Sequence, residues 1–176
     1  MSVIATAIWM ILPVYVANAS AVLVGGGPPI DGGRLWNGKP ILGRHKTWRG
    51  LLGGGAIGCC CGVVQAWVAP AWLPSFGGLP FALLPLLCLS FGAMFGDALG
   101  SLIKRRMGKS EGDPVRGLDQ LDFLLGAWFL VGVCCPRWFL GNFTLPVMVF
   151  LLILTPGLHV LSNIIGHKLG VKHVPW

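Results

Sequence analysis

The chain has 176 residues, of which 55% are hydrophobic and only 11% are charged. Soluble domains carry about 25% charged residues, so this composition excludes an ordinary water-soluble domain and predicts a protein embedded in a membrane. The formal net charge is +7, but the cations lie beside apolar segments, where positive charge marks the cytoplasmic side of a membrane protein. The basic balance therefore does not indicate a nucleic-acid partner.

Five apolar segments have the length that a helix needs to cross the hydrocarbon core, which is about 20 residues. In chain order we place them at about residues 3–24, 51–69, 79–102, 118–135 and 145–165. The first is interpreted as a retained span, because no basic residue precedes it and it is longer than a signal-peptide core. The sequence thus predicts an all-α, polytopic membrane protein in which residues 1–176 form a single integral-membrane domain.

Lysine and arginine residues are distributed unequally between the two sides of these spans. Twelve of the thirteen lie in the connections at about residues 25–50 and 103–118 or in the C-terminal tail, whereas Arg137 alone lies in the other two connections. The positive-inside rule then predicts that both charged loops and the C-terminus are cytoplasmic and that the N-terminus is outside. We expect a multi-pass protein of the cell membrane whose active site faces the cytoplasm.

Glycines recur at every fourth position in the second and third apolar segments. The two sets are Gly54, Gly58 and Gly62, and Gly92, Gly96 and Gly100. Glycines with this spacing share one helix face and let a neighbouring backbone approach closely. They predict tight helix packing rather than chemistry.

The polar end of the third segment combines a carboxylate, a hydroxyl and two cations on one predicted helix face. Asp97, Ser101, Lys104 and Arg105 follow one another at helical offsets. An ionisable residue within a span is costly and usually faces a cavity or a partner. Asp97 is therefore a candidate functional residue, and the alternative is that it only pairs with a neighbouring arginine.

The fourth segment begins with two carboxylates, Asp119 and Asp122, which lie on one helical face. Alone they would be explained by the helix dipole, which favours anions in the first turn. With Asp97 on an adjacent antiparallel helix, three carboxylates could converge at a similar depth. Because Mg²⁺ is often held by one or two carboxylates plus substrate phosphates, the pattern indicates a magnesium site at the membrane surface.

Basic residues of the two charged loops are candidates for binding phosphate groups through charge-assisted hydrogen bonds. In the first loop, a Gly-Arg-His-Lys-Thr run just before a predicted helix is typical of phosphate binding at a helix start, although the P-loop pattern is not met. Lys109 is expected to be an ordinary membrane-surface anchor. The candidate phosphate ligands are Lys46, Thr47, Arg49, Lys104, Arg105, Arg106 and Arg116.

These residues together resemble a known signature, that of the membrane CTP-dependent phosphatidate cytidylyltransferases. The matching positions are Gly96-Asp97, Ser101, Lys104-Arg105, Asp113 and the Asp119-Gln120-Leu121-Asp122 run. The chain departs from the bacterial and eukaryotic pattern, because its loop is shorter, no His-Gly-Gly occurs and Gln120 stands in place of an arginine. These departures, the first loop and the Val-Pro-Trp terminus resemble the archaeal branch, the CDP-archaeol synthases.

The resemblance implies a reaction, a cofactor and partners. The phosphate of an unsaturated archaeal glycerol-diether phosphate would attack the α-phosphorus of CTP, pyrophosphate would leave, and the product would be a CDP-activated lipid. Mg²⁺ is the implied cofactor, with Asp97 and Asp119 as ligands and Asp122 as a contributor. Lys104 joins them as a catalytic residue, Ser101 and Asp113 join the substrate ligands, and the bilayer is the remaining partner. A homo-oligomer is compatible with the pattern.

Three other functional classes compete with a cytidylyltransferase. A transporter of a phosphorylated solute would also use intramembrane carboxylates and glycine-rich helices, but a conduit needs polar residues through its full depth and the charges cluster at one surface. The apolar segments do contain Asn18, Gln65 and Asn163, so this alternative stays open. A metal-dependent lipid-phosphate phosphatase would share the same site with water as the nucleophile. A structural membrane subunit ranks last, because three converging carboxylates would serve no purpose in it.

Overall fold

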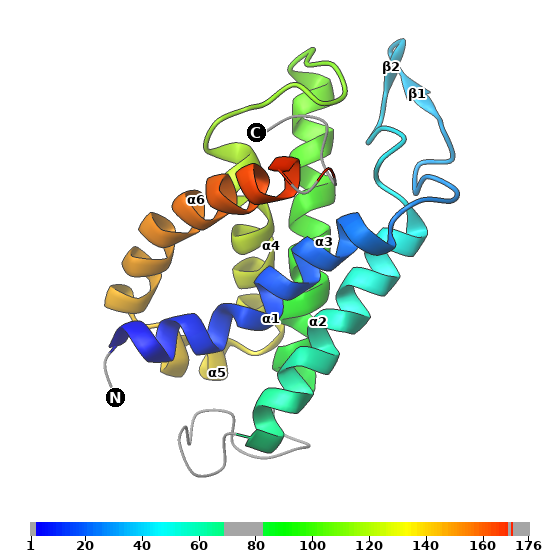
Figure 1. Ribbon diagram of the computed structural model, residues 1–176. Coiled ribbons are helices and arrows are strands. Elements are labelled where there is room, and N and C mark those ends of the chain that lie inside the picture. Colours follow the sequence, from blue (N-terminus) through cyan, green and yellow to red (C-terminus); the bar gives the residue numbers. More distant parts are fainter. Residues whose placement is uncertain (1–2, 69–82, 169, 171–176) are drawn as a thin grey trace.

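The computed structural model describes residues 3–68, 83–168 and 170. These residues form long helices, one short helix and a small hairpin (Figure 1). In chain order the elements are α1 (Val3–Val24), β1 (Leu35–Trp36), β2 (Lys39–Pro40), α2 (Trp48–Val68), α3 (Leu83–Arg106), α4 (Leu118–Cys134), α5 (Pro136–Asn142) and α6 (Leu145–Lys168). The predicted all-α class is confirmed, while the predicted starts and ends at residues 69 and 79–82 lie outside the described part of the chain.

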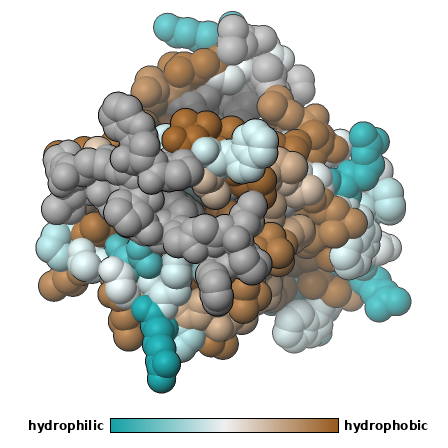
Figure 2. Space-filling view, turned by 90° about the horizontal axis from the view of Figure 1, so that it is seen from below, coloured by the Kyte–Doolittle hydropathy of each residue, from teal (hydrophilic) through white to brown (hydrophobic). Residues whose placement is uncertain are grey.

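Four helices are long and apolar enough to cross a membrane among the described residues: α1, α2, α3 and α6. Helix α4 has 17 residues and is therefore about 25 Å long, which is short of the roughly 30 Å hydrocarbon core. A multi-pass membrane protein is thus confirmed with four candidate spans, whereas the crossing of the membrane by the predicted fourth segment stays a prediction. Figure 2, seen from below, shows hydrophobic residues over much of the surface that is coloured, as contact with lipid tails requires.

Helices α3 and α4 pack with their backbones in direct contact, and glycines make this possible. A Cβ atom on Gly92 would lie 2.8 Å from the Cα of Ala127, and one on Gly96 would lie 2.8 Å from the Cα of Gly126. A Cβ on Gly100 would collide with the carboxylate of Asp122. The predicted packing role of these glycines is confirmed, and the contact places the polar start of α4 against the polar end of α3.

The glycines of α2 have the same role toward its two neighbours. A Cβ on Gly54 would meet the carbonyl oxygen of Ala17 at 2.8 Å and the sulfur of Met94 at 2.9 Å. A Cβ on Gly58 would meet the carbonyl oxygen of Pro13 at 2.7 Å. Helix α2 is therefore pressed against both α1 and α3, so that three helices converge below the charged loops.

The charged connections lie at one end of the molecule. Figure 1 shows the hairpin and the connection after α3 at the top, and both meet the last turns of α3 there. The hairpin turns at Asn37 and Gly38, whose φ angles of 52° and 73° are those of a type I′ turn. This hairpin was not predicted, although Asn-Gly is a strong hairpin signal.

The contact between α3 and α4 predicts a sharp asymmetry between two glycine substitutions. Gly96→Ala should lower the free energy of unfolding by about 1–3 kcal/mol, as overpacking in a dense core does, because its methyl group would meet the backbone of α4. Gly157→Ala in α6 is the control, because a Cβ there meets nothing within 4 Å and alanine favours a helix. Thermal unfolding of both proteins in detergent checks this, and equal stability of the two variants would contradict the packing.

Candidate active site

The charged loops and the ends of three helices enclose a cavity of about 600 Å³. Its walls come from the C-terminal part of α1, the loop that leads into α2, the first turn of α2 and the last turns of α3. Glu111 and Gly112 complete the wall from the second loop. Six of the predicted site residues line this cavity: Lys46, Thr47, Asp97, Ser101, Lys104 and Arg105.

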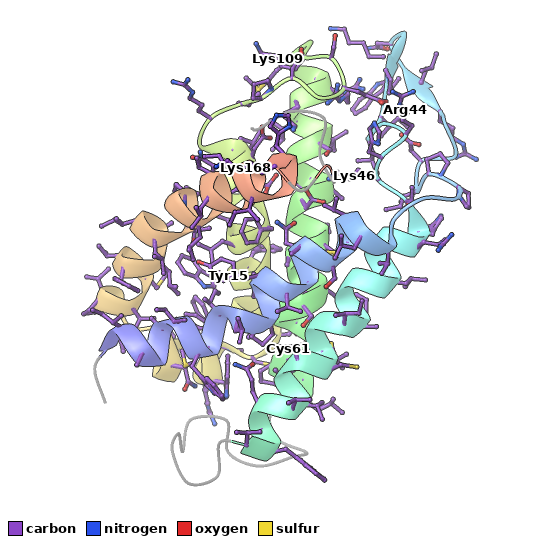
Figure 3. All side chains as sticks on the ribbon, viewed as in Figure 1. Tyr15, Arg44, Lys46, Cys61, Lys109 and Lys168 are labelled. Atoms are coloured by element: carbon purple, nitrogen blue, oxygen red, sulfur yellow. The ribbon has the colours of Figure 1, made fainter. Side chains whose placement is uncertain are left out.

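Asp97 is paired with a lysine from the first loop. The Nζ atom of Lys46 lies 2.5 Å from Oδ2 of Asp97, and about a quarter of each side chain is exposed, 24% and 27%. Figure 3 shows Lys46 between the first loop and α3. The partner is therefore not the neighbouring arginine of the alternative prediction, and the pair joins two segments that are distant in sequence.

A second pair lies one to two turns further along α3. The Nζ atom of Lys104 donates to Oδ1 of Asp119 over 2.6 Å, while the other oxygen of Asp119 accepts the N–H of Val115 at 2.8 Å. Asp119 does not line the cavity itself, but its partner Lys104 does. The cavity wall thus carries two ammonium groups, each held by one carboxylate.

Asp122 completes the predicted group of carboxylates at the contact of α3 and α4. It is buried, its Oδ1 accepts the N–H of Phe123 at 2.7 Å, and it interacts electrostatically with both Asp97 and Asp119. Within the described residues, no three His, Cys, Asp or Glu side chains are grouped closely enough to hold a metal ion alone. Any Mg²⁺ here would need fewer carboxylates together with phosphate oxygens, which is its common arrangement.

The adjacent arginines of α3, Arg105 and Arg106, make different contacts. Arg105 lines the cavity and is only 5% exposed, and its Nη1 donates to the carbonyl oxygen of Lys109 at 2.7 Å. Its buried Nε has no hydrogen-bond partner among the described residues. A buried guanidinium with unused donors is suited to an incoming anion.

Arg106 instead anchors the hairpin. It donates to the carbonyl oxygens of Trp36 at 2.9 Å and Pro40 at 2.7 Å, and its guanidinium lies 4.7 Å from the centre of the Trp36 ring. It does not line the cavity. The sequence predicted the same phosphate-binding role for both arginines, whereas the structure gives Arg106 to the hairpin.

Thr47 and Ser101 are buried residues of the cavity wall. The hydroxyl oxygen of Thr47 accepts the N–H of Gly50 at 3.1 Å, which caps the start of α2. Thr47 thereby fixes the position of the preceding Lys46. Its contribution to the site is structural at least in part.

Three other predicted substrate ligands do not line the cavity. Arg49 is exposed beside Gly27, and Arg116 is exposed on the second loop. Asp113 accepts the N–H of Ser110 at 2.7 Å and so closes a turn within the second loop. The structure does not bring these three residues together with the six predicted site residues that line the cavity.

Two carboxylates that the sequence did not single out organise the first loop. Asp31 accepts the N–H groups of Gly33 at 2.9 Å, Leu42 at 2.8 Å and Gly43 at 3.2 Å. Partial desolvation alone would raise the pKa of Asp31, but these backbone donors together hold it below its usual value. An Asp before two glycines is a local turn signal that could have revealed its part in the loop.

Glu111 joins the two charged loops across the outer end of the cavity. Its carboxylate accepts the N–H of Arg44 at 3.0 Å, pairs with Nε of the same arginine at 3.0 Å, and lies 3.7 Å from Nε2 of His45. Any side chain at Gly43, whose φ is +101°, would press against Glu111. No local pattern could have predicted this contact, because the partners are 67 residues apart.

Comparisons with known proteins agree over the full length of the chain. Residues 1–176 match the family model described as CarS-like, CDP-archaeol synthase. The chain is 48% identical to the CDP-archaeol synthase of Thermococcus gammatolerans over 171 residues, which cover 97% of this chain and 95% of the relative. It is 44% identical over 174 residues to that of Methanosarcina acetivorans, covering 94% and 99%.

A solved structure is also similar, one described as an intramembrane enzyme for archaeal membrane lipids biosynthesis. It superposes with a TM-score of 0.74 at 35% sequence identity and covers 90% of this chain and 92% of the solved chain. At this identity the likeness extends to sequence as well as fold.

The hydrogen bonds to Asp31 predict that this residue holds the first loop in shape. Asp31→Ala should increase the rate of trypsin cleavage at the basic residues of the loop several-fold, because three backbone donors lose their acceptor. Asp31→Asn keeps one acceptor oxygen and should show a smaller increase. The pKa of Asp31 in the folded protein is lowered from 3.8. The stabilisation of the loop by the Asp31 carboxylate is therefore complete above pH 3.8 and is lost as the pH falls through the lower folded pKa. Unchanged cleavage in the alanine variant would refute this role.

Proposed function

The chain belongs to the CarS-like CDP-archaeol synthase family, and we propose that it catalyses Mg²⁺-dependent cytidylyl transfer from CTP to an unsaturated archaeal glycerol-diether phosphate. Family membership makes it a membrane-embedded cytidylyltransferase of archaeal lipid synthesis. The observation that carries the finer proposal is the cavity at the loop end of α3, with its two lysine–carboxylate pairs and the buried Arg105. CTP and the lipid phosphate are the proposed substrates of this cavity, and CDP-archaeol and pyrophosphate are the proposed products.

The cations of the cavity suit a reaction between phosphates. The nucleophile is a phosphate oxygen that is already anionic, so the site needs positioning and charge neutralisation rather than a strong base. Lys46, Lys104 and Arg105 present positive charge to the same cavity. Each lysine has an internal carboxylate partner, so an arriving phosphate exchanges one anion for another instead of meeting an unpaired charge.

The carboxylates fit a hard divalent cation. Asp97 and Asp119 each already have one cation, a lysine ammonium group, within 2.6 Å of an oxygen, and oxygen anions are the ligands that Mg²⁺ prefers. We assign Asp97 and Asp119 as its ligands, with Asp122 as a contributor. When bound, Mg²⁺ supplies neutralisation of the phosphate charge, while the lysines and Arg105 orient the remaining phosphate oxygens.

Two of the polar groups within the helices are used for contacts between helices rather than for lining a conduit. The amide nitrogen of Gln65 donates to the carbonyl oxygen of Trp9 at 2.8 Å, and the hydroxyl of Tyr15 is bonded to Thr155 at 2.7 Å. These groups tie helices together and do not line the cavity. The side chain of Asn163 lies outside the described residues. A transporter of a phosphorylated solute and a lipid-phosphate phosphatase remain the alternative functions, and the assay described next distinguishes them from a cytidylyltransferase.

The proposed reaction is tested with purified protein in detergent, CTP, Mg²⁺ and a saturated or unsaturated diether phosphate. We expect stoichiometric pyrophosphate and CDP-lipid, no product from the uncharged lipid alcohol, and less activity with Ca²⁺, whose coordination is looser. Release of inorganic phosphate from the lipid without consumption of CTP would identify a phosphatase. Accumulation of a phosphorylated solute in liposomes, without consumption of nucleotide, would identify a transporter.

Carboxylate variants test the proposed metal ligands in the same assay. Asp97→Asn and Asp119→Asn should reduce turnover by at least about a hundredfold, because each removes an anionic oxygen from the proposed Mg²⁺ site. Asp31→Asn is the matched control, because Asp31 does not line the cavity, and it should keep most of the activity. Near-normal turnover in both Asp97 and Asp119 variants would rule out the assignment.

We also propose the orientation in the membrane. In this arrangement α4 is one of five crossings, the N-terminus is outside, and the loops and C-terminus are cytoplasmic. In a cysteine-free background, single cysteines at His45 and Ser110, both exposed, should react with an impermeant reagent only from the cytoplasmic side. A cysteine at Gly141 should react only from outside. Labelling of positions 45 and 110 from opposite sides would overturn the orientation.

A further inference from the structure

Asn18 forms part of the cavity wall, although it comes from a helix with no charged residue. An uncompensated amide within a membrane helix is costly, and such groups usually bond to a neighbouring helix. Gln65 of α2 follows this rule, because its amide donates to the carbonyl oxygen of Trp9 at 2.8 Å. Over the part of the chain that the structure describes, the amide of Asn18 makes no hydrogen bond, so its donors are available to a molecule in the cavity.

Asn18 lies at the end of the cavity that is deeper in the helices. It precedes the end of α1 by about two turns, and Met94, also in the wall, is about one turn deeper than Asp97. From Met94 to Arg105 the cavity follows α3 for about 16 Å. The side chains around this deeper end, from Ala21, Val22, Leu51 and Met94, are apolar.

The two substrates differ in which end they can occupy. The cations that suit phosphates, Lys46, Lys104 and Arg105, belong to the loop end, where a nucleotide arrives from water. Val22, four residues after Asn18 on α1, lines the cavity and is 57% exposed. If this exposed surface faces lipid, the chains of a lipid substrate beside Asn18 would remain in the bilayer.

We propose that Asn18 helps to bind the lipid substrate by donating a hydrogen bond from Nδ2 to an ether oxygen of its glycerol backbone. An ether oxygen accepts but cannot donate, and the amide offers two N–H donors. With the lipid phosphate among the cations, the glycerol is the next part of the molecule toward the bilayer. This inference rests on the proposed function, since it takes the lipid phosphate as a substrate of the cavity.

The test compares Asn18→Leu, which keeps the approximate side-chain size, with Gln65→Leu as a matched amide control. For Asn18→Leu we expect the KM for the diether phosphate to rise about three- to tenfold, the value of one hydrogen bond, with the KM for CTP within twofold of wild type. Gln65→Leu should lower thermal stability and leave both KM values unchanged. A lipid analogue with methylene groups in place of the ether oxygens should bind the wild type about three- to tenfold more weakly than the diether phosphate does. The Asn18→Leu variant should bind the analogue and the diether phosphate equally well.

Several results would overturn the proposal. A rise in the KM for CTP alone would assign Asn18 to the nucleotide, and unchanged KM values would leave it no role in binding. If Asn18→Leu does not fold, Asn18→Ala is measured in the same way. If the wild type transfers no cytidylyl group, the proposed function fails, and direct binding of radiolabelled diether phosphate to both proteins still decides: weaker binding by the variant supports Asn18, and equal binding refutes it.

Discussion

The close contact between α3 and α4 is the constraint on which the rest of the structure depends. Glycines at the interface bring the two backbones together without intervening side chains, and this distance decides where the carboxylates of α4 lie. Asp122 rests against Gly100, and Asp119 reaches Lys104 on the next turn of α3. A larger residue in this interface would separate the helices and so disperse the charged group. Packing and chemistry are therefore specified by the same face of α3.

The two lysine–carboxylate pairs of the cavity also prepare the site for a change of partner. Lys46 and Lys104 are held by carboxylates at 2.5 and 2.6 Å, so neither side chain has to search for its position when a phosphate arrives. Arg105 differs, because its charge is buried and is held by a backbone carbonyl oxygen rather than by a carboxylate among the described residues. When a phosphate binds, each lysine can thus exchange its carboxylate partner for the phosphate, whereas Arg105 gains an anionic partner without losing one.

The sequence was informative where the signal was local and periodic. Glycine spacing predicted the helix contacts, and helical offsets correctly placed Asp97, Ser101, Lys104 and Arg105 along one cavity wall. It was less informative where a side chain's partner is distant, as for Lys46 and Asp97, or Arg44 and Glu111. Arg105 and Arg106 show a further limit, because adjacent residues on a helix point about 100° apart and only the fold reveals which one faces the cavity. The bounds predicted for the fourth apolar segment, about residues 118–135, were close to those of α4, Leu118–Cys134, because the apolar run itself marks them.

The link between Glu111 and Arg44 has a consequence for the environment in which the protein works. Arg44 is 79% exposed, whereas Lys46 and Asp97 are about three-quarters buried. Dissolved ions screen exposed charges strongly and enclosed pairs much less. Rising ionic strength therefore weakens the attraction that joins the two loops before it affects the pair deeper in the cavity. The link between the two loops at the outer wall of the cavity is for this reason more sensitive to the salt content of the surrounding solution than the Lys46–Asp97 pair is.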